Sequence, residues 1–345
     1  MQPVFANDLR SPHTGTLDLL AADIGGTHAR IGLIRARTGS ASLDVLAYHK
    51  YVCADWPGLP AILDDFLRRE ARQTVKYCAI AIAGYPVDDR VINENLAWPV
   101  SGRELRQALR FTDVALVNDF AALAHALRNI DAGEGLALIS TAIASASGAR
   151  LVIGPGTGLG AAVLVPHTPR PVVLATEAGQ VALAPRTALE REILGVMATG
   201  DRHVPVEAAL SGPGIVNLYN AVATLRGATP TLASPAAVTA AAMAGSDAIA
   251  RLALDVFCGL LGGYVGDLAM LFNAGGGVFL AGGVLAHMHD FLLRSSFVER
   301  FLDKGGMRTV LERVPLRLLE HGRLGVLGAA GWFLDGGAST DTAKS

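Results

Sequence analysis

Cysteine is scarce in this sequence. Of its 345 residues, three are cysteines, Cys53, Cys78 and Cys258, and they lie far apart with no CxxC pair and no Cys/His cluster. This pattern argues against a disulfide framework and against a structural zinc site, and it fits a reducing compartment. We therefore expect a cytoplasmic protein.

An excess of charge of one sign is also lacking. The 29 Lys and Arg residues nearly balance the 31 Asp and Glu residues, the formal net charge is −2, and no Lys/Arg-rich run occurs. Binding to nucleic acid or to an anionic membrane surface therefore has no electrostatic basis here. No apolar run reaches the roughly 18 residues of a membrane span, because the longest apolar region, 252–284, is broken by glycines and by Asp255, Asp267 and Asn273.

The length and the apolar content are sufficient for two domains. Hydrophobic residues make up 51% of the chain and charged residues 17%, which is typical of a globular protein with buried cores. We predict a mobile leader over residues 1–16 and a small α/β domain formed by 17–130 together with 322–335. A large α/β domain then covers 131–321, and 336–345 form a disordered tail.

The segment Leu17–Gly32 predicts a strand, a tight glycine turn and a returning strand. An apolar run ends at Asp23, passes into Gly25, Gly26 and Thr27, and is followed by a second apolar run. Glycines in such a turn allow backbone N–H groups to approach phosphate oxygens, and Asp23 can hold a cation-bound water beside them. The alternative is an ordinary Gly-Gly hairpin with a solvated aspartate.

A second glycine-rich segment, GPGTGLGAA at 154–162, follows the apolar residues 151–153. It matches the relaxed GxGxxA dinucleotide fingerprint, with Glu177 about twenty residues further on. That fingerprint requires a helix directly after the glycines, whereas the residues here are β-rich and end at Pro166. We interpret the segment as a second phosphate loop, so that two similar sheets face each other across a cleft. The Walker motif GxxxxGK[ST] is absent, which excludes a P-loop protein.

Asn118 and Asp119 follow a predicted strand over 114–117 and precede a predicted helix. Open α/β sheets bind ligands at this edge, and an aspartate there can accept a hydroxyl proton from a substrate. Asp119 can equally be a simple helix N-cap, which is the commoner role of an aspartate at such a position.

Further polar and glycine residues lie at the ends of predicted elements. Glu177 and Gln180 are three residues apart in a small-residue turn, and Glu207 precedes a helix start at Ser211-Gly212-Pro213. Gly282-Gly283 end a buried strand, where they form either a nucleotide contact or a plain strand-to-helix turn. We also predict a strand over 315–319 and helices over 57–73, 187–199, 235–245, 247–272 and 325–334. The small, polar segment 136–150 is interpreted as a connection or an exposed hairpin.

Five groups of motifs, in this order, resemble the bacterial glucokinase family within the actin-like superfamily of sugar kinases. They are DIGGTHAR (23–30), NENLAW (93–98), VNDFAA (117–122), GPGTGLG (154–160) with TEAGQV (176–181), and EAALSGPGIVNLY (207–219) with FLAGGV (279–284). The resemblance runs from Leu17 to Leu334. It implies a two-domain actin-like ATPase (ribonuclease H-like) fold, in which each domain is a mixed sheet flanked by helices, with an interdomain cleft.

The resemblance also implies roles for individual residues. Asp119 would be the general base that takes the proton of the glucose 6-hydroxyl as it attacks the γ-phosphate of ATP. The implied sugar-binding residues are Asn95, Asn118, Asp119, Glu177, Gln180 and Glu207. The implied ATP-binding residues are Ala22, Asp23, Ile24, Gly25, Gly26, Thr27, Gly156, Thr157, Gly158, Gly282 and Gly283, with Mg²⁺ held by Asp23 through water. The family also makes a homodimer possible.

The chain departs from the family pattern at the sugar motif. Gln180 stands where the family usually has a histidine, and a glutamine donates and accepts hydrogen bonds but takes no charge. The preferred hexose therefore stays open between glucose, mannose and an amino sugar. A weakly catalytic sugar-sensing relative is the other alternative. The cysteine-rich zinc motif of the related repressor and kinase family is missing, which favours the zinc-free branch.

Overall fold

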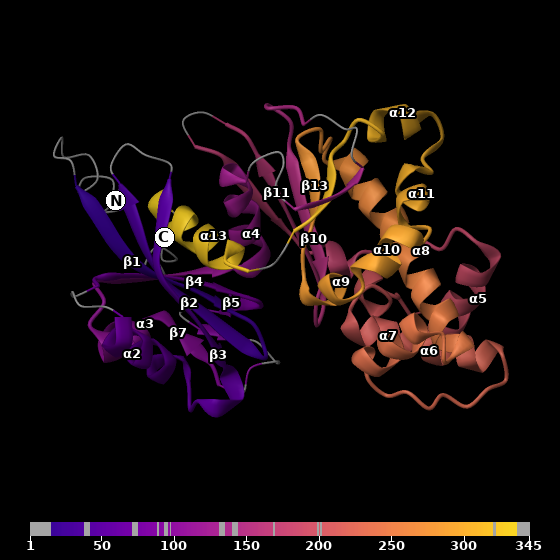
Figure 1. Ribbon diagram of the computed structural model, residues 1–345, viewed down its shortest axis with the longest axis horizontal. Coiled ribbons are helices and arrows are strands. Elements are labelled where there is room, and N and C mark those ends of the chain that lie inside the picture. The colour runs from indigo at the N-terminus through magenta and orange to yellow at the C-terminus, as the bar shows by residue number, and fades with distance from the viewer. Residues whose placement is uncertain are drawn as a thin grey trace. The chain divides into compact units, whose positions relative to one another are not determined.

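The computed structural model describes residues 15–37, 42–70, 75–87, 90–92, 96, 98–130, 135–139, 144–167, 170–198, 200, 202–319 and 322–336. The chain forms two compact units, each with a sheet of its own (Figure 1). The first unit comprises Met1–Asp131, His167–Val173 and Gly322–Ser345, and the second comprises Ala132–Pro166 and Leu174–His321. Val172 and Val173 are grouped with the first unit, although they are also the first two residues of a strand in the sheet of the second unit.

The first unit is built on a five-stranded mixed sheet in the order β3-β2-β1-β4-β8. Its strands are β1 (Thr16–Ile24), β2 (His28–Arg37), β3 (Leu43–Val52), β4 (Tyr77–Ile82) and β8 (Asp113–Asn118). The first three strands are antiparallel, whereas β1, β4 and β8 are parallel. Ile24 pairs with Ile82 and Ile82 with Asn118, so the carboxyl ends of the parallel strands share one edge.

Alternate side chains along each strand point to opposite faces of this sheet, and helices cover both faces. The helices are α2 (Leu59–Glu70), α3 (Gly102–Leu109), α4 (Asp119–Ala126) and α13 (Leu324–Leu334). On one face, Leu20 and Ile80 share a core with Phe66 of α2. On the other face, the strands share a core with α4 and α13. Gly328 is required where these helices meet, since a Cβ there would lie 1.9 Å from the Ala122 carbonyl oxygen.

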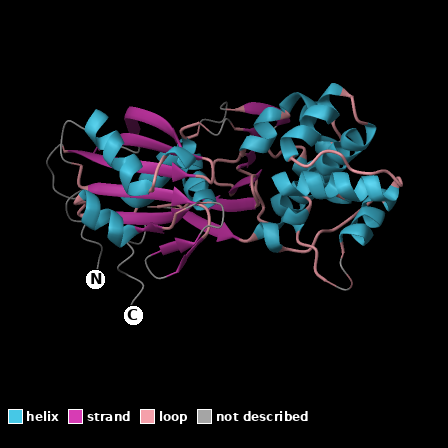
Figure 2. Cartoon of the chain, turned by 90° about the horizontal axis from the view of Figure 1, so that it is seen from below, coloured by secondary structure: helices cyan, strands magenta, loops and turns pink. Residues whose placement is uncertain are grey.

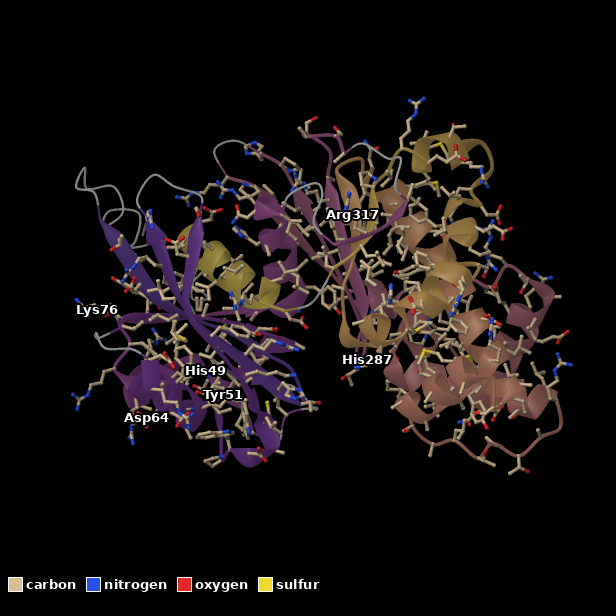
Figure 3. All side chains as sticks on the ribbon, viewed as in Figure 1. His49, Tyr51, Asp64, Lys76, His287 and Arg317 are labelled. Atoms are coloured by element: carbon tan, nitrogen blue, oxygen red, sulfur yellow. The ribbon has the colours of Figure 1, made fainter. Side chains whose placement is uncertain are left out.

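Polar side chains fasten α2 to the edge strand β3. His49 Nε2 lies 2.7 Å from Glu70 Oε1, and the Tyr51 hydroxyl donates to Asp65 Oδ2 at 3.0 Å. Figure 3 shows His49 and Tyr51 beside each other. A small sheet of β5 (Tyr85–Val87), β6 (Arg90–Ile92) and β7 (Val100–Ser101) follows in the chain, and the sequence reading did not predict it.

The second unit has a six-stranded mixed sheet in the order β12-β11-β10-β13-β14-β9. Its strands are β9 (Leu136–Ile139), β10 (Arg150–Pro155), β11 (Leu159–Val165), β12 (Val172–Thr176), β13 (Gly277–Leu280) and β14 (Leu316–Leu318). Interpreting 136–150 as a connection or an exposed hairpin was wrong for residues 136–139, because β9 pairs antiparallel with β14 in this sheet. The apolar run of β9 is four residues long and its partner lies about 180 residues away, so no local pattern announces the pairing.

The helices of the second unit gather into one cluster (Figure 2). They are α5 (Ala188–Met197), α6 (Gly212–Leu225), α7 (Pro235–Ala244), α8 (Ala248–Leu271), α9 (Gly283–His287), α10 (His289–Arg294), α11 (Phe297–Leu302) and α12 (Arg308–Leu311). Thr187, Ser211, Ser234 and Asp247 cap α5 to α8 through side-chain oxygens that accept backbone N–H groups, as N-cap residues do.

Helix α8 is the central helix of this cluster. Within the described part of the chain, it is the one helix with the length and apolar composition of a membrane span, and 67% of its apolar window is buried inside the protein. It packs against α6, α7 and α11. At Gly262 a Cβ would lie 2.1 Å from the Phe297 carbonyl oxygen, so this glycine permits the close approach of α11. These contacts make α8 a core helix.

Candidate functional site

The first glycine loop joins β1 to β2 at residues 25–27, as the sequence predicted. The loop closes with a hydrogen bond from the Gly25 N–H to the His28 carbonyl at 3.0 Å. Asp23, two residues before the loop, is 5% exposed, and its Oδ2 lies 3.2 Å from Arg30 Nη1. A Cβ on Gly325 would lie 2.6 Å from the Asp23 carboxyl carbon, so the first turn of α13 lies against this carboxylate. The positive end of a helix dipole favours a negative charge there.

Cys53 supports the same loop from the short helical turn η1 (Cys53–Asp55). Its N–H donates to the Thr27 carbonyl at 2.9 Å, and its thiol donates to the Gly25 carbonyl at 3.5 Å. Burial raises the pKa of the Cys53 thiol, so the thiol keeps the proton that it donates. The sequence reading treated Cys53 as an isolated cysteine, because nothing local connects it to a loop 28 residues earlier.

Asn118 and Asp119 lie where β8 passes into α4. The N-cap is Asn118, whose Oδ1 accepts the N–H groups of Phe120 and Ala121 at 3.0 and 3.1 Å. Asp119 is the first residue of the helix, and its Oδ1 accepts the Phe120 N–H at 2.9 Å. The capping role that the sequence offered for Asp119 therefore belongs to Asn118, because Asn118 is the residue with extended backbone before the helix.

One edge of the first sheet brings these residues together. Because Ile24, Ile82 and Asn118 are in register across three parallel strands, the backbones of Ile24 and Asn118 are separated by about 10 Å, twice the strand spacing. Asp23, its loop and Asp119 thus share the carboxyl edge of β1, β4 and β8. Asn95, which the sequence also assigned to the sugar, lies outside the described residues.

The second glycine loop joins β10 to β11 at residues 156–158. The Gly156 N–H donates to the Gly158 carbonyl, and the N–H of Gly212, the first residue of α6, donates to the Gly156 carbonyl, both at 2.8 Å. Gly282 has a φ of +104°, and a Cβ on it would lie 2.6 Å from the Pro155 carbonyl oxygen. The structure therefore brings the Gly282-Gly283 pair against this loop.

Glu207 connects the loop to the sugar motif. Its Oε1 accepts a hydrogen bond from Gln180 Nε2 at 2.7 Å, and its Oε2 accepts the Leu159 N–H at 3.4 Å. Cβ atoms on Gly158 and Gly179 would lie 2.8 and 3.0 Å from Oε2. Both positions must be small for the carboxylate to approach the loop.

Glu177 lies at the start of the helical turn η3 (Ala178–Gln180), which closes through the Gln180 N–H and the Glu177 carbonyl at 2.9 Å. Two further residues, Ser211 and His203, form hydrogen bonds beside this motif. The Ser211 hydroxyl donates to the Glu207 carbonyl at 2.7 Å, and His203 Nε2 lies 2.8 Å from the Gln180 carbonyl oxygen. The Ser211 cap was visible in the sequence, whereas the His203 contact needs the fold.

His287 is a further residue that the sequence reading missed. Its Nδ1 lies 2.6 Å from the Gly283 carbonyl oxygen, so this nitrogen carries the proton that it donates. Figure 3 shows His287 on α9, below β13, directly after the glycine pair in the chain. The contact fixes the carbonyl of the second glycine of the pair.

Known proteins with similar sequences and structures lead to one family. The sequence model of the glucokinase family, described as "Glucokinase", matches residues 20–335. A glucokinase-like protein of Xylella fastidiosa (strain 9a5c) is 50% identical over 321 residues, which are 92% of this chain and 94% of that protein. The chain belongs to the glucokinase family.

Solved structures agree with this membership. The crystal structure of a glucokinase from an Antarctic psychrotroph superposes with a TM-score of 0.80 at 35% identity, covering 91% of this chain and 98% of that one. A ROK family glucokinase from Streptomyces griseus, solved in complex with glucose and AMPPNP, gives a TM-score of 0.60 at 21% identity, covering 91% and 98%. The second likeness concerns the fold alone. The two mixed sheets flanked by helices are thus the actin-like ATPase fold of the glucokinase family, as predicted.

Proposed function

We propose that this glucokinase-family protein transfers the γ-phosphate of ATP to the 6-hydroxyl of glucose, giving glucose 6-phosphate and ADP. The observation that best supports the proposal is the position of Glu207, whose carboxylate bonds both Gln180 and the N–H that follows the second glycine loop. A hydroxyl-binding carboxylate is thereby joined to a phosphate-binding loop. A sugar phosphorylated by a nucleotide needs these two groups next to each other.

Asp119 is the proposed general base. Its carboxylate accepts the proton of the sugar 6-hydroxyl while that oxygen forms a bond to the γ-phosphorus and the bond from phosphorus to the ADP oxygen breaks. Asp119 lies in the first turn of α4. In the proposal, Asn95, Asn118, Glu177, Gln180 and Glu207 hold the other hydroxyls.

The backbone from Ala22 to Thr27 and residues 156–158 hold the phosphates in this proposal, and Gly282-Gly283 lie at the adenosine. Asp23 suits a magnesium ion bound through water: it is a single buried carboxylate, and the described residues contain no cluster of three His, Cys, Asp or Glu side chains. Mg²⁺ keeps several water ligands and takes the rest from phosphate oxygens. When bound, it neutralises charge on the phosphates.

The proposal also covers the substrates, the location and the assembly. Glucose as the acceptor is supported by membership of the glucokinase family, and a protein of the same fold, that of Streptomyces griseus, was solved with glucose and AMPPNP. A cytoplasmic location is supported by Cys53, Cys78 and Cys258, which are free, buried thiols. A homodimer is the assembly that the family suggests.

Gln180 favours a second candidate, a kinase for another hexose such as mannose or an amino sugar. Its side-chain N–H is directed to Glu207 Oε1 at 2.7 Å, which occupies a carboxylate oxygen that would otherwise accept a sugar hydroxyl. The set of hydroxyls recognised by Glu207 can therefore differ from that of relatives with a histidine at this position.

The test is ATP-dependent phosphorylation of a panel of hexoses by the wild type and by Asp119→Asn. We expect glucose to react fastest and the variant to lose about 10²- to 10⁴-fold in kcat, the usual contribution of a general base. The matched control is Asp113→Asn, at the other end of β8. Preferential turnover of another hexose would support the second candidate, and hexose binding without turnover by the wild type would identify a sugar sensor.

A further inference from the structure

The turn that presents Glu177 and Gln180 rests on a side chain outside every motif of the sequence analysis. This residue is Tyr264, in the middle of α8, and its hydroxyl donates to the Ala178 carbonyl at 2.5 Å. We infer that Tyr264 is a positioning residue for hexose binding, acting through the backbone of η3. The inference rests on the proposed hexose kinase function and deepens it.

The Ala178 carbonyl that accepts this hydrogen bond is buried and needs a donor. Ala178 is 6% exposed, and a buried backbone carbonyl without a hydrogen bond is costly. Burial raises the pKa of Tyr264 to about 12, so the hydroxyl stays protonated and remains a donor at every physiological pH.

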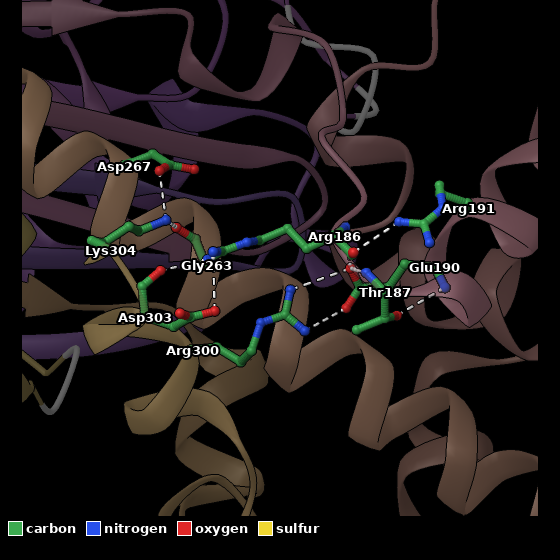
Figure 4. Close-up of polar contacts among 9 residues, drawn as sticks. All are labelled: Arg186, Thr187, Glu190, Arg191, Gly263, Asp267, Arg300, Asp303 and Lys304. Atoms are coloured by element: carbon green, nitrogen blue, oxygen red, sulfur yellow. Dashed lines mark hydrogen bonds and ion pairs between the residues drawn. The ribbon is translucent and has the colours of Figure 1, made fainter. Parts of the chain in front are cut away.

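The backbone of α8 around Tyr264 is itself held firmly. Lys304 Nζ donates to the Gly263 carbonyl at 2.7 Å and to Asp267 Oδ1 at 2.5 Å. Arg300 bonds the two carboxylate oxygens of Glu190 at 2.7 and 3.2 Å, which connects α11 to α5. Figure 4 shows these contacts around Gly263, the residue before Tyr264. The phenol thus extends from a fixed helix to the turn.

The Tyr264 side chain also lines a small cavity of the second unit. A small cavity of about 20 Å³ lies between α8 and the segment after η3, and Leu183, Val206 and Leu260 contribute apolar parts of its lining next to Tyr264. Close packing helps to fix the backbone of a buried segment, and Ala178 is part of the core of this unit. The Tyr264 hydroxyl adds a directional contact to this packing.

The hydrogen bonds on the other side of η3 involve its last residue. The Gln180 side chain bonds Glu207 and the Gln180 carbonyl lies against His203, so Gln180 is held independently of Tyr264. The carbonyl of Ala178 lies one residue after Glu177. Loss of the Tyr264 hydroxyl should therefore displace Glu177 first and leave the Gln180–Glu207 contact in place.

The test is Tyr264→Phe, with Tyr219→Phe as the matched control. Tyr219 is a buried tyrosine of the same unit whose hydroxyl lies 3.1 Å from Asp247 Oδ2 and has no contact with η3. Tyr264→Phe loses the hydrogen bond to Ala178, and Tyr219→Phe loses those of its hydroxyl with Asp247 and Thr231, so both variants should lose a few degrees in Tm. We expect Tyr264→Phe alone to raise KM for the hexose about two- to tenfold, the equivalent of one net hydrogen bond, with kcat and KM for ATP unchanged.

Hydrogen exchange separates this inference from the proposed function. In the absence of any substrate, amides 178–181 should exchange faster in Tyr264→Phe than in the wild type or Tyr219→Phe. Unchanged protection there, or a hexose KM equal to that of wild type, would overturn the inference. If the wild type turns over no hexose, the proposed function fails, and the exchange measurement alone decides whether Tyr264 holds the turn.

Discussion

The two glycine hairpins have the same topology and different support. In each, an antiparallel strand pair continues into a parallel neighbour: β2-β1-β4 in the first unit and β11-β10-β13 in the second. The first hairpin is held by Cys53, which binds two of its carbonyls, whereas the second is held by the Gly212 N–H and the Glu207 carboxylate. The N–H and the thiol of Cys53 donate to carbonyls of the first hairpin and the Gly212 N–H donates to a carbonyl of the second, whereas the Glu207 carboxylate accepts an N–H of the second.

The acidic residues beside the hairpins also differ in their partners. Asp23 is paired with the Arg30 cation, whereas the close partner of Glu207 is the neutral amide of Gln180. Asp23 can therefore lie next to phosphates with part of its charge compensated. Under the proposed function Asp23 faces the phosphates and Glu207 faces the sugar hydroxyls, and the difference in their partners fits these two roles.

The largest expected difference between the two hairpins is in how well a glycine can be replaced by alanine. A Cβ on Gly154 would lie 2.1 Å from the Ala281 carbonyl oxygen, in the parallel pairing of β10 with β13. We expect Gly154→Ala to lower the free energy of unfolding by about 1–3 kcal/mol or more. Urea denaturation measures this loss.

Two alanine variants serve as controls for Gly154→Ala. Gly25 in the first hairpin has its nearest neighbour at 3.6 Å, and Gly156 has none within 4 Å. Alanine at either position should change the stability by less than the Gly154 substitution does. Equal losses at Gly25 and Gly154 would contradict the difference in packing between the two hairpins.

Removal of the thiol should weaken the first hairpin alone. We expect Cys53→Ala to cost about 0.5–1.5 kcal/mol of stability and to raise KM for ATP several-fold, because the Gly25 carbonyl loses its donor. Cys258→Ala removes an equally buried thiol from the second unit. It should lower Tm without changing KM for ATP. Equal ATP kinetics in the two variants would show that the thiol does not position the loop.

A fall in pH should weaken one ion pair in each unit. The resulting loss of stability is the smallest of the expected effects. Burial raises the pKa of Glu190, but hydrogen bonds from Arg300 and from backbone N–H groups outweigh it and leave the pKa below 4.5. Burial likewise raises the pKa of Asp335, and its bonds to His125 and Arg128 lower it below 3.8. Carboxylates with lowered pKa values stabilise the fold above their ordinary pKa and lose that contribution as the pH falls.

The measurement is Tm between pH 7 and pH 3. We expect Tm to fall below about pH 4.5 as these two carboxylates become protonated. Glu190→Gln should flatten this decline by removing the contribution of the second unit, at the cost of a lower Tm at pH 7. A decline of the same size in this variant and in the wild type would show that Glu190 is not responsible.

Much of the secondary structure followed from local pattern. The helix predicted over 247–272 is Ala248–Leu271, that over 325–334 is Leu324–Leu334, and both glycine hairpins form where the apolar runs meet the glycines. The small sheet β5-β6-β7 and the strands β9 and β12 were not predicted. They are short, and their partners rather than their own residues make them strands.

In the candidate site, too, some features followed from the sequence and others depended on the fold. The sequence alone determined which residue types lie at which strand ends. A tight turn needs glycine and a helix start needs a cap, and both requirements act within a few positions along the chain. A hydroxyl that is bound needs an acceptor, which the acidic and amide residues at these strand ends supply. Only the tertiary structure decided that Asn118 and not Asp119 is the cap, and that Cys53 bonds the first loop. It also decided that Glu207 connects Gln180 to the second loop and that the Tyr264 hydroxyl bonds the Ala178 carbonyl. The side-chain contacts of Cys53, Gln180 and Tyr264 join residues 27 to 86 positions apart, and a hydrogen bond depends on distances of a few ångströms that only the packed fold sets.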